Sequence, residues 1–318
     1  MTRLRPVEPA DYERLAAIGT AIDPAESRGP DWYRERDASW NPRLLRYRLA
    51  AERDGLVVGW GELGHGWWAY HPQKFYLRLN VDPDFQRQGV GACLYSGLLD
   101  HVVANWNPRQ ISAEASEVRP WSVAFLQHRG FEEAHRRWDA ALEVAEGKLE
   151  RLPSATRRVA DQGLSVVTLA DERQRRGDHF ARDLYEFEQR IYRDEPGYDP
   201  EGSLLFDQFL AVELNPETAL DGGSFLALDG TRMVAISRLR RDSRRPGILH
   251  VGFTGVDAAY RGRGLALALK LLTIDYARQH GFVEIRTEND ATNAPMLHIN
   301  LELGFKLEPA SVILHKPL

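Results

Sequence analysis

Two short glycine-containing segments carry the residue types that bind phosphate groups. The first, residues 86–91, reads Gln-Arg-Gln-Gly-Val-Gly, and the second, residues 261–266, reads Arg-Gly-Arg-Gly-Leu-Ala. Each follows an apolar, strand-like run, over 75–81 or 248–256, and precedes a helical pattern. Such a turn gathers backbone N–H groups at the positive end of a helix dipole, and glycine lets an anion approach the backbone. Both segments therefore predict a turn that holds a pyrophosphate.

The residues around both turns resemble the acetyl-CoA-binding motif of the GNAT superfamily of N-acetyltransferases. The first copy reads Val81-x-Pro83-x-x-Gln86-Arg87-Gln88-Gly89-Val90-Gly91. The second copy reads Gly255-Val256-x-x-x-Tyr260-Arg261-Gly262-Arg263-Gly264-Leu265-Ala266. Each is followed by a strand pattern, a helix pattern and the family's Gly-Phe dipeptide, at 130–131 and 304–305. The resemblance implies an α/β fold of two tandem GNAT-like domains, each a mixed, mostly antiparallel sheet flanked by helices.

In this family the turn holds the pyrophosphate, and the strand before it pairs with the pantetheine arm of acetyl-CoA, the acyl-donor substrate. The resemblance therefore implies a cofactor-binding set in each unit, made of Val81, Gln86, Arg87, Gln88, Gly89, Val90 and Gly91 in the first and of Val256, Arg261, Gly262, Arg263, Gly264, Leu265 and Ala266 in the second. Asn293 matches an asparagine that often contacts coenzyme A in the family, although capping of a helix is an equal alternative. No metal is expected.

The spacing of the two copies indicates a duplicated domain. The turns are 261 − 86 = 175 residues apart, and the Gly-Phe dipeptides are 304 − 130 = 174 residues apart. Solenoid repeats are much shorter, at about 20–50 residues. A charged, poorly patterned stretch separates the two series of elements. We expect an N-terminal unit at 1–147, a linker at 148–162 and a C-terminal unit, the catalytic one, at 163–318.

The expected elements follow a similar order in both units and indicate a mixed α/β fold. In the first unit they are a helix over 11–22, a hairpin over 47–52 and 56–63, a strand over 75–81, a helix over 89–103, a strand over 110–115, a helix over 120–128 and one or two strands over 131–144. In the second they are a strand over 164–169, a long helix over 171–192, a helix over 204–212, strands over 225–228, 233–239 and 248–256, a helix to 280, a strand over 283–288 and a helix over 293–303.

Composition narrows the class of protein. The chain has 318 residues, enough for about two domains, and its net charge of −5 argues against nucleic acid as the default partner. The single cysteine, Cys93, excludes an intrachain disulfide and fits a reducing compartment. The sequence shows no signal-peptide layout and no apolar run long enough to span a bilayer, so we expect a cytoplasmic protein without a membrane partner. The oligomeric state is not predicted.

Acetyl transfer to an amine needs a polarised thioester carbonyl and a group that deprotonates the amine. Glu114 and Glu288 occupy equivalent places on the strand after each cofactor helix, and we prefer Glu288 as the catalytic base. A solvent-facing strand glutamate is the alternative. Glu284 shares the face of Glu288 by the two-residue period of a strand. His250 lies on the strand that leads to the second turn and is another candidate, because histidine is the usual side chain for proton exchange near neutral pH, but a structural histidine is the favoured interpretation there.

The leaving thiolate must also be stabilised. Many family members carry a tyrosine four residues before the glycine of Gly-Phe, and the matching residues here are Leu126 and Asn300. Leucine cannot donate a proton, whereas Asn300 can donate a hydrogen bond. Because a thiol has a pKa of about 8.5, water or the Asn300 amide can suffice. The richer set of polar groups around Glu288 and Asn300 favours the second unit as the catalytic one.

The acceptor is the least determined part. Carboxylates and tyrosines that suit a cationic amine, or simply form a solvated acidic loop, gather in one segment of the second unit: Tyr192, Asp194, Glu195, Tyr198, Asp199, Glu201 and Asp207. Four tryptophans of the first unit line either a pocket or an interface: Trp32, Trp40, Trp67 and Trp68.

The sequence thus predicts an acetyl-CoA-dependent N-acetyltransferase acting by direct attack of a primary amine of a small molecule. Two alternatives stay open. In the first, both units are active, in a layout similar to that of the mycothiol-forming acetyltransferase, a tandem member of the family with a cysteinyl amine as acceptor. The chain can also be read as an acyl-CoA-binding regulatory protein without turnover, which the missing tyrosines would favour.

Overall fold

The computed structural model describes residues 1–24, 28–195 and 198–318. In the N-terminal half every predicted element is present, together with a first strand and a second helix that the sequence patterns did not predict. The elements are β1 (Arg3–Pro6), α1 (Tyr12–Ile22), α2 (Pro30–Ala38), β2 (Arg46–Arg53), β3 (Leu56–Gly64), β4 (Lys74–Val81), α3 (Val90–Trp106), β5 (Gln110–Ser116), α4 (Pro120–Gln127) and β6 (Glu132–Glu143).

The C-terminal half repeats this series with one correction. The prediction of a single helix over 171–192 was wrong, because Gly177, at φ +57°, ends one helix and turns the chain before the next begins. The elements are α5 (Leu152–Ala160), β7 (Ser165–Thr168), α6 (Leu169–Arg176), α7 (Phe180–Tyr192), α8 (Phe206–Val212), β8 (Phe225–Asp229), β9 (Arg232–Arg241), β10 (Ile248–Val256), α9 (Leu265–Gln279), β11 (Glu284–Asp290), α10 (Ala294–Leu303), β12 (Lys306–Leu307) and β13 (Ser311–Pro317).

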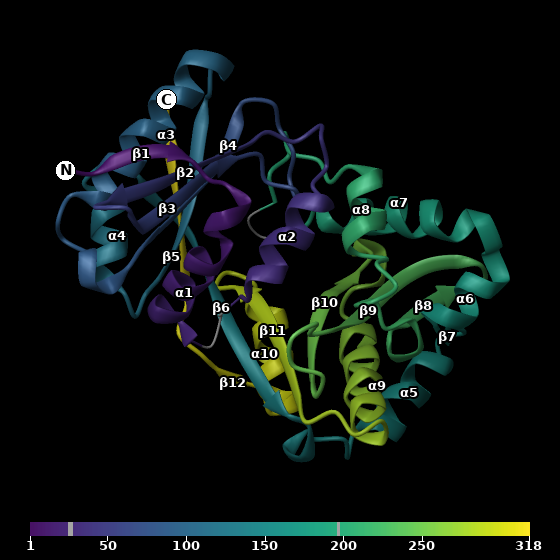
Figure 1. Cartoon of the computed structure of the whole chain (residues 1–318). Helices are drawn as coiled ribbons and strands as arrows, with labels where there is room; N and C mark the ends of the chain where they lie inside the picture. Colours follow the sequence, from purple (N-terminus) through teal and green to yellow (C-terminus); the bar gives the residue numbers. More distant parts are fainter. Residues whose placement is uncertain (25–27, 196–197) are drawn as a thin grey trace.

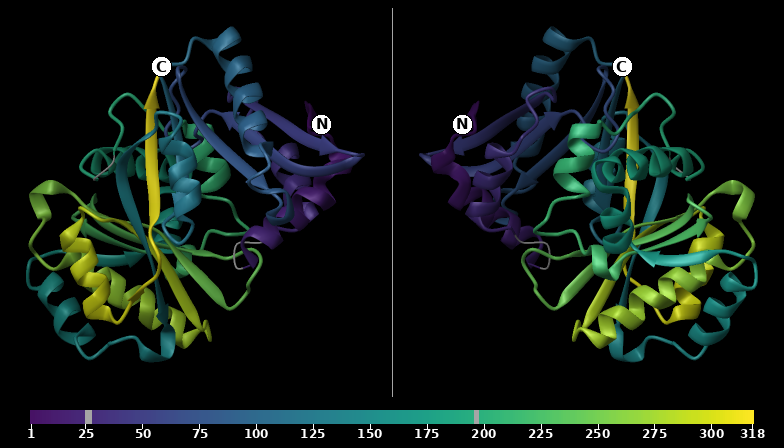
Figure 2. Two further views of the ribbon diagram at one scale, coloured as in Figure 1. Left: turned by 90° about the vertical axis from the view of Figure 1, so that its left-hand side faces the viewer. Right: turned by 90° about the vertical axis from the view of Figure 1, so that its right-hand side faces the viewer.

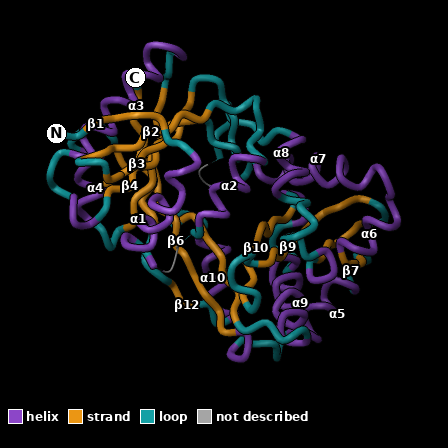
Figure 3. The backbone as a smooth tube through the Cα atoms, in the orientation of Figure 1, coloured by secondary structure: helices purple, strands orange, loops and turns teal. Residues whose placement is uncertain are grey.

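A single sheet runs through both halves (Figures 1 and 3). Within the described residues it has 13 strands, in the order β1-β2-β3-β4-β5-β13-β6-β11-β10-β9-β8-β7, with β12 paired to β6 beside this path. The expected hairpin of the first half is present, with β2 antiparallel to β3, and β8 pairs with β9 in the same way in the second half. The fold is therefore the mixed α/β arrangement that the sequence predicts.

Helices cover both faces of the sheet, and alternating strand residues show which helix lies on which face. In β2, Leu49 belongs to the apolar core that includes α3, whereas Ala50 belongs to the core that includes α1. In β9, Ala235 packs with residues of α9, whereas Ile236 packs with residues of α7. Each helix after a glycine turn thus lies on one face, with α1 or α7 on the other. No helix in the described part of the chain is long and apolar enough to cross a membrane.

The two halves exchange their last strands. The C-terminal strand β13 lies in the N-terminal half, antiparallel to β5 from Ser311 opposite Ser116 to Pro317 opposite Gln110. The second part of β6, from Arg137 to Glu143, lies in the C-terminal half, where it pairs with the whole length of β11. Figure 2 shows the yellow C-terminal strand crossing to the half that holds the N-terminus. Each proposed unit is therefore completed by a strand from the other.

The expected linker, 148–162, is largely structured. It contains α5, which packs along α9. Val159 of α5 is buried in a core with Leu265 of α9. We expected no element here because the stretch is highly charged. One apolar residue per turn is enough to pack this helix against the core, since only one of its faces is covered.

Shortening a residue of β13 should loosen the opposite half of the chain. Val312 is 1% exposed and belongs to the core of the N-terminal half. We expect Val312→Ala to lower the free energy of unfolding by about 1.5 kcal/mol, the loss of two buried methyl groups. Hydrogen exchange should report faster opening of β5 and α3. Faster opening confined to the C-terminal half would contradict the exchanged arrangement.

The central parallel strands of each half separate where the glycine turns follow. β4 pairs with β5 only from Lys74 opposite Gln110 to Leu77 opposite Ala113. Likewise, β10 pairs with β11 only as far as His250, opposite Arg286. Beyond Leu77 and His250 the backbone edges that face β5 and β11 are unpaired, so each half presents polar backbone groups in the gap.

Candidate active site

Both glycine turns have the same backbone conformation. Gly89 and Gly264 cap the N-termini of α3 and α9, each with a φ of +84°. Two residues earlier, Arg87 and Gly262 also have positive φ values, +60° and +73°. A Cβ built on Gly89 would meet no atom within 4 Å, so this turn is open at the end of the helix. The chain thus presents two helix N-termini whose backbone N–H groups suit an anion.

The first side chain of each turn supports the turn from within instead of reaching outward. Gln86 Nε2 donates to the Val81 carbonyl at 3.0 Å, and Arg261 Nε donates to the Val256 carbonyl at 3.2 Å. These bonds occupy the two carbonyl groups that lie nearest the turns. The backbone that remains for a pantetheine arm is therefore the unpaired stretch just before each valine.

The other side chains of the turns divide between core and surface. Val90 and Leu265 are buried, at 1% and 2% exposure, and hold the first turn of each helix in the core. The Gln88 amide donates to a backbone carbonyl of its own turn at 2.9 Å. The Arg263 guanidinium lies over the Tyr260 ring at 4.7 Å. Of these residues only Arg263 offers a charge to a ligand.

In the N-terminal half, aromatic rings pack beside the turn. A Cβ added to Gly91 would lie 3.4 Å from the ring of Phe125 on α4 and 3.7 Å from Val81. The Phe125 ring also contacts Tyr95, with centroids 6.5 Å apart, and lies under the Arg129 guanidinium at 3.6 Å. Helices α3 and α4 are thus packed together across the end of the gap between β4 and β5.

The corresponding place in the C-terminal half is more polar. By the 174-residue offset, Ile299 replaces Phe125 and Asn300 replaces Leu126. Asn300 is fully buried, its Nδ2 donates to Asn289 of β11, and its Oδ1 has no hydrogen-bond partner. The sequence-predicted residue Asn300 therefore lies between α10 and β11 with unused hydrogen-bonding capacity.

Lys270 is a buried cation that the sequence analysis missed. It is 2% exposed, lies over the Phe305 ring at 5.4 Å and replaces Tyr95 of the first half. Burial lowers the pKa of Lys270 to about 7, because the charged ammonium is poorly solvated there. The signal in the sequence was its position, one helical turn after Ala266 within a run of leucine and alanine.

Asn293 acts as a helix cap. Its Oδ1 accepts a hydrogen bond from the backbone N–H of Met296 at 3.3 Å, at the N-terminus of α10. The capping alternative for Asn293 is therefore confirmed. Contact between its amide nitrogen and coenzyme A stays a prediction.

The two equivalent glutamates meet at one arginine on the exchanged strand β6. Arg137 Nε pairs with Glu288 at 2.9 Å, and Arg137 Nη2 pairs with Glu114 at 3.1 Å. Tyr76 of β4 donates to Glu114 at 2.9 Å. We call Tyr76, Glu114, Arg137, Asp139 and Glu288 the central cluster. It lies on the sheet between the separated ends of both strand pairs.

The carboxyl groups of the central cluster differ in environment. Burial raises the pKa of Glu114, but Arg137 and Tyr76 outweigh it, so this pKa lies below its usual value. Glu288 has a side chain that is 57% exposed. Asp139 lies directly opposite Glu288 in the strand pairing, and burial, reinforced by the Glu288 charge, raises the pKa of Asp139 to about 7. Asp139 is thus a carboxyl group poised near neutral pH.

Sequence reasoning did not find Arg137 or Asp139. Both lie on β6, which the sequence assigns to the first unit, whereas Glu288 belongs to the second. Only the strand exchange brings them together. The one signal available was the presence of charged residues at alternate positions 137 and 139 of a strand, which is also typical of a solvent-facing edge.

Most of the acidic segment contacts the N-terminal half. Lys74 pairs with Asp199 at 2.8 Å and Glu201 at 2.7 Å, and Arg43 approaches Asp207 at 3.6 Å. A backbone bridge between Tyr70 and Ser203 joins the same regions. Asp194 instead pairs with Arg261 of the glycine turn at 2.7 Å. Four of the five carboxylates therefore hold the protein together, so neither a solvated loop nor a purely acceptor-binding loop describes them.

Glu195 is the exception, because the charged groups near its carboxylate are Asp290 and Arg137. Its Oε2 is buried without a hydrogen-bond partner, and burial, with the nearby Asp290 charge, raises the pKa of Glu195 to about 7. Tyr192 lies close by, with its ring 5.7 Å from that of Phe253 on β10, and burial raises its pKa. These residues stand over the face of the separated strands that carries the central cluster.

The four tryptophans of the first half lie in two separate groups. Trp68 lies edge-on to Tyr76 of the central cluster, with centroids 5.1 Å apart, and contacts Trp67. Trp32 and Trp40 both lie near the Arg36 guanidinium, at 5.0 and 5.3 Å. Trp67 and Trp68 are therefore the pair beside the candidate site.

The two alternate bases are placed elsewhere. His250 Nε2 lies 3.0 Å from Asp242, a contact that is consistent with the structural interpretation of this histidine. Glu284 lies opposite Ile248, at the paired end of β10 and β11, and its nearest cation is Arg286 at 3.6 Å. Neither side chain belongs to the separated part of the strands.

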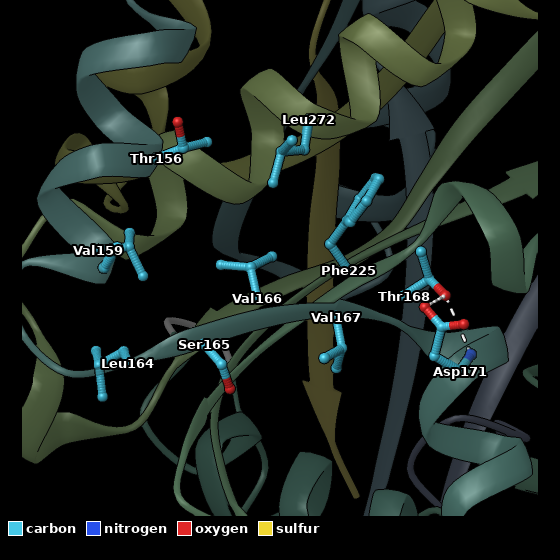
Figure 4. A pocket seen from close by; sticks show the side chains of 11 residues that line it. Thr156, Val159, Leu164, Ser165, Val166, Val167, Thr168, Asp171, Phe225 and Leu272 are labelled. Atoms are coloured by element: carbon cyan, nitrogen blue, oxygen red, sulfur yellow. Dashed lines mark hydrogen bonds between the residues drawn. The ribbon is translucent and has the colours of Figure 1, made fainter.

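A hollow under α5 does not carry the chemistry. Figure 4 shows it between α5, β7 and α9, with Val159, Val166, Phe225 and Leu272 around an apolar space. Its polar groups at one end are already paired, since the Thr168 hydroxyl donates to Asp171 at 2.7 Å. No set of polar side chains converges there, in contrast to the central cluster.

Comparison with known proteins finds one family and several relatives. The model of the acetyltransferase (GNAT) family matches residues 14–131 and 181–305. A mycothiol acetyltransferase of Parafrankia sp. (strain EAN1pec) is 26% identical over 285 residues, which cover 85% of this chain and 83% of the relative.

Solved structures share the fold over the whole chain. A tandem GNAT protein of the clavulanic acid biosynthesis pathway, determined without acetyl-CoA, has a TM-score of 0.76 and 17% identity, covering 100% of this chain and 98% of its own. A GCN5-related N-acetyltransferase of Sphaerobacter thermophilus has a TM-score of 0.73 and 18% identity, covering 99% and 95%. Both family matches end at a Gly-Phe dipeptide, before the exchanged strands.

Proposed function

This chain belongs to the acetyltransferase (GNAT) family, and we propose that it transfers the acetyl group of acetyl-CoA to a primary amine of a small molecule, with the C-terminal half as the catalytic one. The observation that supports this assignment is the difference between the two gaps. Phe125 packs beside the first turn, and the residue that follows it, Leu126, is replaced in the second half by Asn300, whose Oδ1 has no hydrogen-bond partner.

The donor would be held by backbone. The turn from Gly262 to Gly264 would bind the pyrophosphate through N–H groups at the α9 N-terminus. The unpaired edge of β10 before Val256 would hydrogen-bond the pantetheine arm and orient the thioester. Acetyl-CoA supplies an acyl group already activated as a thioester. These residues therefore need to bind and orient it, and no metal is required by this chemistry.

A carboxyl pair on the central cluster would deprotonate the amine. Glu288 and Asp139 are direct neighbours on β11 and β6, and a group with a pKa near 7 suits a base at neutral pH. The amine nitrogen attacks the carbonyl carbon, the C–N bond forms, the C–S bond breaks and the carboxylate takes the proton of the amine. The Nδ2 of Asn300 has a second hydrogen to donate to the departing thiolate, which then takes a proton from water.

The charge around this pair favours a cationic acceptor. The carboxyl group of Asp139 lies near Glu288 and Arg137, and that of Glu195 lies near Asp290 and Arg137. Carboxyl groups therefore outnumber cations among these residues. Burial, reinforced by neighbouring carboxylates, raises the pKa values of Asp139 and Glu195, and a protonated amine would offset the repulsive part of that effect. The similarity to a relative named a mycothiol acetyltransferase supports a small-molecule acceptor for this chain.

Calorimetric titration with acetyl-CoA tests the proposal directly. We expect Gly264→Glu to abolish binding at the C-terminal turn, because the substitution adds a side chain and a negative charge at φ +84°. Gly89→Glu is the matched control in the first half, and it should leave binding at the C-terminal turn and acetyl transfer in place. One functional turn would support a single catalytic half, while two would support the alternative in which both halves are active.

Two results would count against the proposal. Wild-type protein that takes up no acetyl-CoA would remove the donor from the reaction. Binding without acetyl transfer to any of a broad panel of amines would favour the regulatory alternative. Circular dichroism spectra and melting curves of both glutamate variants would show whether they keep the fold.

A further inference from the structure

Helix α5 places two arginines beside the glycine turn of the C-terminal half. Arg157 and Arg158 lie at the end of α5, where they line a groove together with Gly262 and Arg263 of the turn. A Cβ built on Gly264 would lie 3.4 Å from Cδ of Arg158, so this side chain stands over the mouth of the turn.

The arginines of this groove have no acidic partners. Among the residues that the structure describes, Arg157, Arg158 and Arg263 form no ion pair, although ion pairs are frequent elsewhere, as at Arg137 and Arg261. Arg263 donates to the Ala259 carbonyl at 3.0 Å, which leaves most of its guanidinium free. Unpaired arginines that converge beside an anion-binding turn are suited to phosphate.

The groove also contains a carboxylate that reduces its positive charge and a glutamine that fixes its shape. Asp161 lines it and carries one negative charge against the three arginines, so the site remains positive. Gln162 Nε2 donates to the carbonyls of Arg158 at 2.7 Å and Arg263 at 3.2 Å, which ties the end of α5 to the turn. The helix is therefore held in place beside the turn before any ligand arrives.

We propose that α5 forms a phosphate clamp for acetyl-CoA in the C-terminal half, with Arg158 over the diphosphate and Arg157 and Arg263 on the 3′-phosphate. This inference rests on the proposed function, because it takes acetyl-CoA as the ligand of this turn. Helix α5 lies between the two family-matched ranges, 14–131 and 181–305, whereas Arg263 lies within the second. The clamp makes the two turns unequal in their affinity for the same ligand.

The test compares two donors on two forms of the full-length chain. Acetyl-CoA and acetyl-dephospho-CoA, which lacks the 3′-phosphate, are titrated into the Gly89→Glu chain with and without Arg157→Gln and Arg158→Gln. We expect the double substitution to raise the Kd for acetyl-CoA about tenfold or more, since two charge-assisted hydrogen-bond donors are lost. Lys148→Gln with Arg151→Gln, at the far end of α5, removes the same charge and should change either Kd less than about twofold.

The two donors distinguish which phosphate the arginines bind. A loss confined to acetyl-CoA assigns the clamp to the 3′-phosphate, and an equal loss for both donors assigns it to the diphosphate; either supports the clamp. Unchanged Kd values for both donors would overturn it. In that case tight binding to the parent chain would show that the proposed function survives, whereas a parent chain that binds neither donor would defeat the proposed function itself. The KM for each donor, measured without the Gly89 substitution, provides the same comparison independently.

Discussion

A chain carrying both Asp139→Asn and Glu288→Gln should lose nearly all acetyl transfer. We expect kcat to fall by about 10²–10⁴-fold, the usual contribution of a general base, because an alkylammonium cannot attack the thioester until it loses a proton. Acetyl-CoA affinity should stay nearly unchanged, since neither residue belongs to the glycine turn. Steady-state kinetics with the best amine from a screen, combined with calorimetry for the donor, would measure both effects.

The single variants show which carboxyl group takes the proton. The pKa of Asp139 is raised to about 7, so if Asp139 is the base, kcat/KM rises through about pH 7 as the carboxyl group deprotonates. Asp139→Asn would remove that rise. Glu288→Gln would move its midpoint to lower pH, because the neighbouring negative charge that raises the Asp139 pKa is gone. If Glu288 is the base, Glu288→Gln gives the larger loss of kcat.

Glu114→Gln is the matched control for this series. Glu114 contacts the same Arg137, but it belongs to the first half, where Phe125 packs beside the glycine turn. We expect a much smaller loss of kcat than in Glu288→Gln. An equal loss of kcat would mean that acetyl transfer depends on Arg137, which pairs with both glutamates, or that the first half also performs transfer.

Stability provides a second readout for Asp139. Its folded pKa is raised above the ordinary value, so the folded state holds the proton more tightly and loses stability as pH rises from about 4 to about 7. Asp139→Asn should therefore be at least as stable as the parent chain at pH 8. A variant that is both inactive and clearly less stable would indicate a structural role.

Replacing the buried Lys270 by methionine should stabilise the protein. The side chain is 2% exposed and has no carboxylate partner among the residues that the structure describes, and burial lowers its pKa to about 7. We expect Lys270→Met to raise the free energy of unfolding at pH 7 by about 1–4 kcal/mol, the range seen when buried charges are replaced by apolar residues of similar volume. Urea unfolding curves would measure the change.

The pH dependence separates the charge from the packing. Because the folded pKa is lowered, the penalty for burying the ammonium is fully present below about pH 7 and disappears as pH approaches the unfolded value of about 10.4. The gain from Lys270→Met should therefore shrink between pH 7 and pH 10. Tyr95→Phe, at the equivalent place in the first half, removes a hydrogen bond from Lys316 (2.9 Å) and should not stabilise the chain. A destabilised Lys270→Met variant would show that the ammonium is satisfied in the folded protein.

Local features were predictable where short-range geometry sets them. The turns at Gly89 and Gly264 depend on positive φ and on a helix that starts there, both of which neighbouring residues specify. The hairpin at Asp54 and Gly55 was predictable for the same reason. The prediction of one long helix over 171–192 was wrong because Gly177, whose φ is positive, ends α6.

The sequence by itself determined the family resemblance, the duplication with its 175-residue offset and the α/β order of elements, because these follow from motifs and from the periods of helices and strands. The tertiary structure decided which strands lie side by side. Nothing in the alternating pattern of β6 or β13 specifies a neighbour, since any strand of suitable length can pair through its backbone. That choice alone brings Arg137 and Asp139 to Glu288, and burial, which also depends on distant contacts, sets the protonation of Asp139 and Lys270.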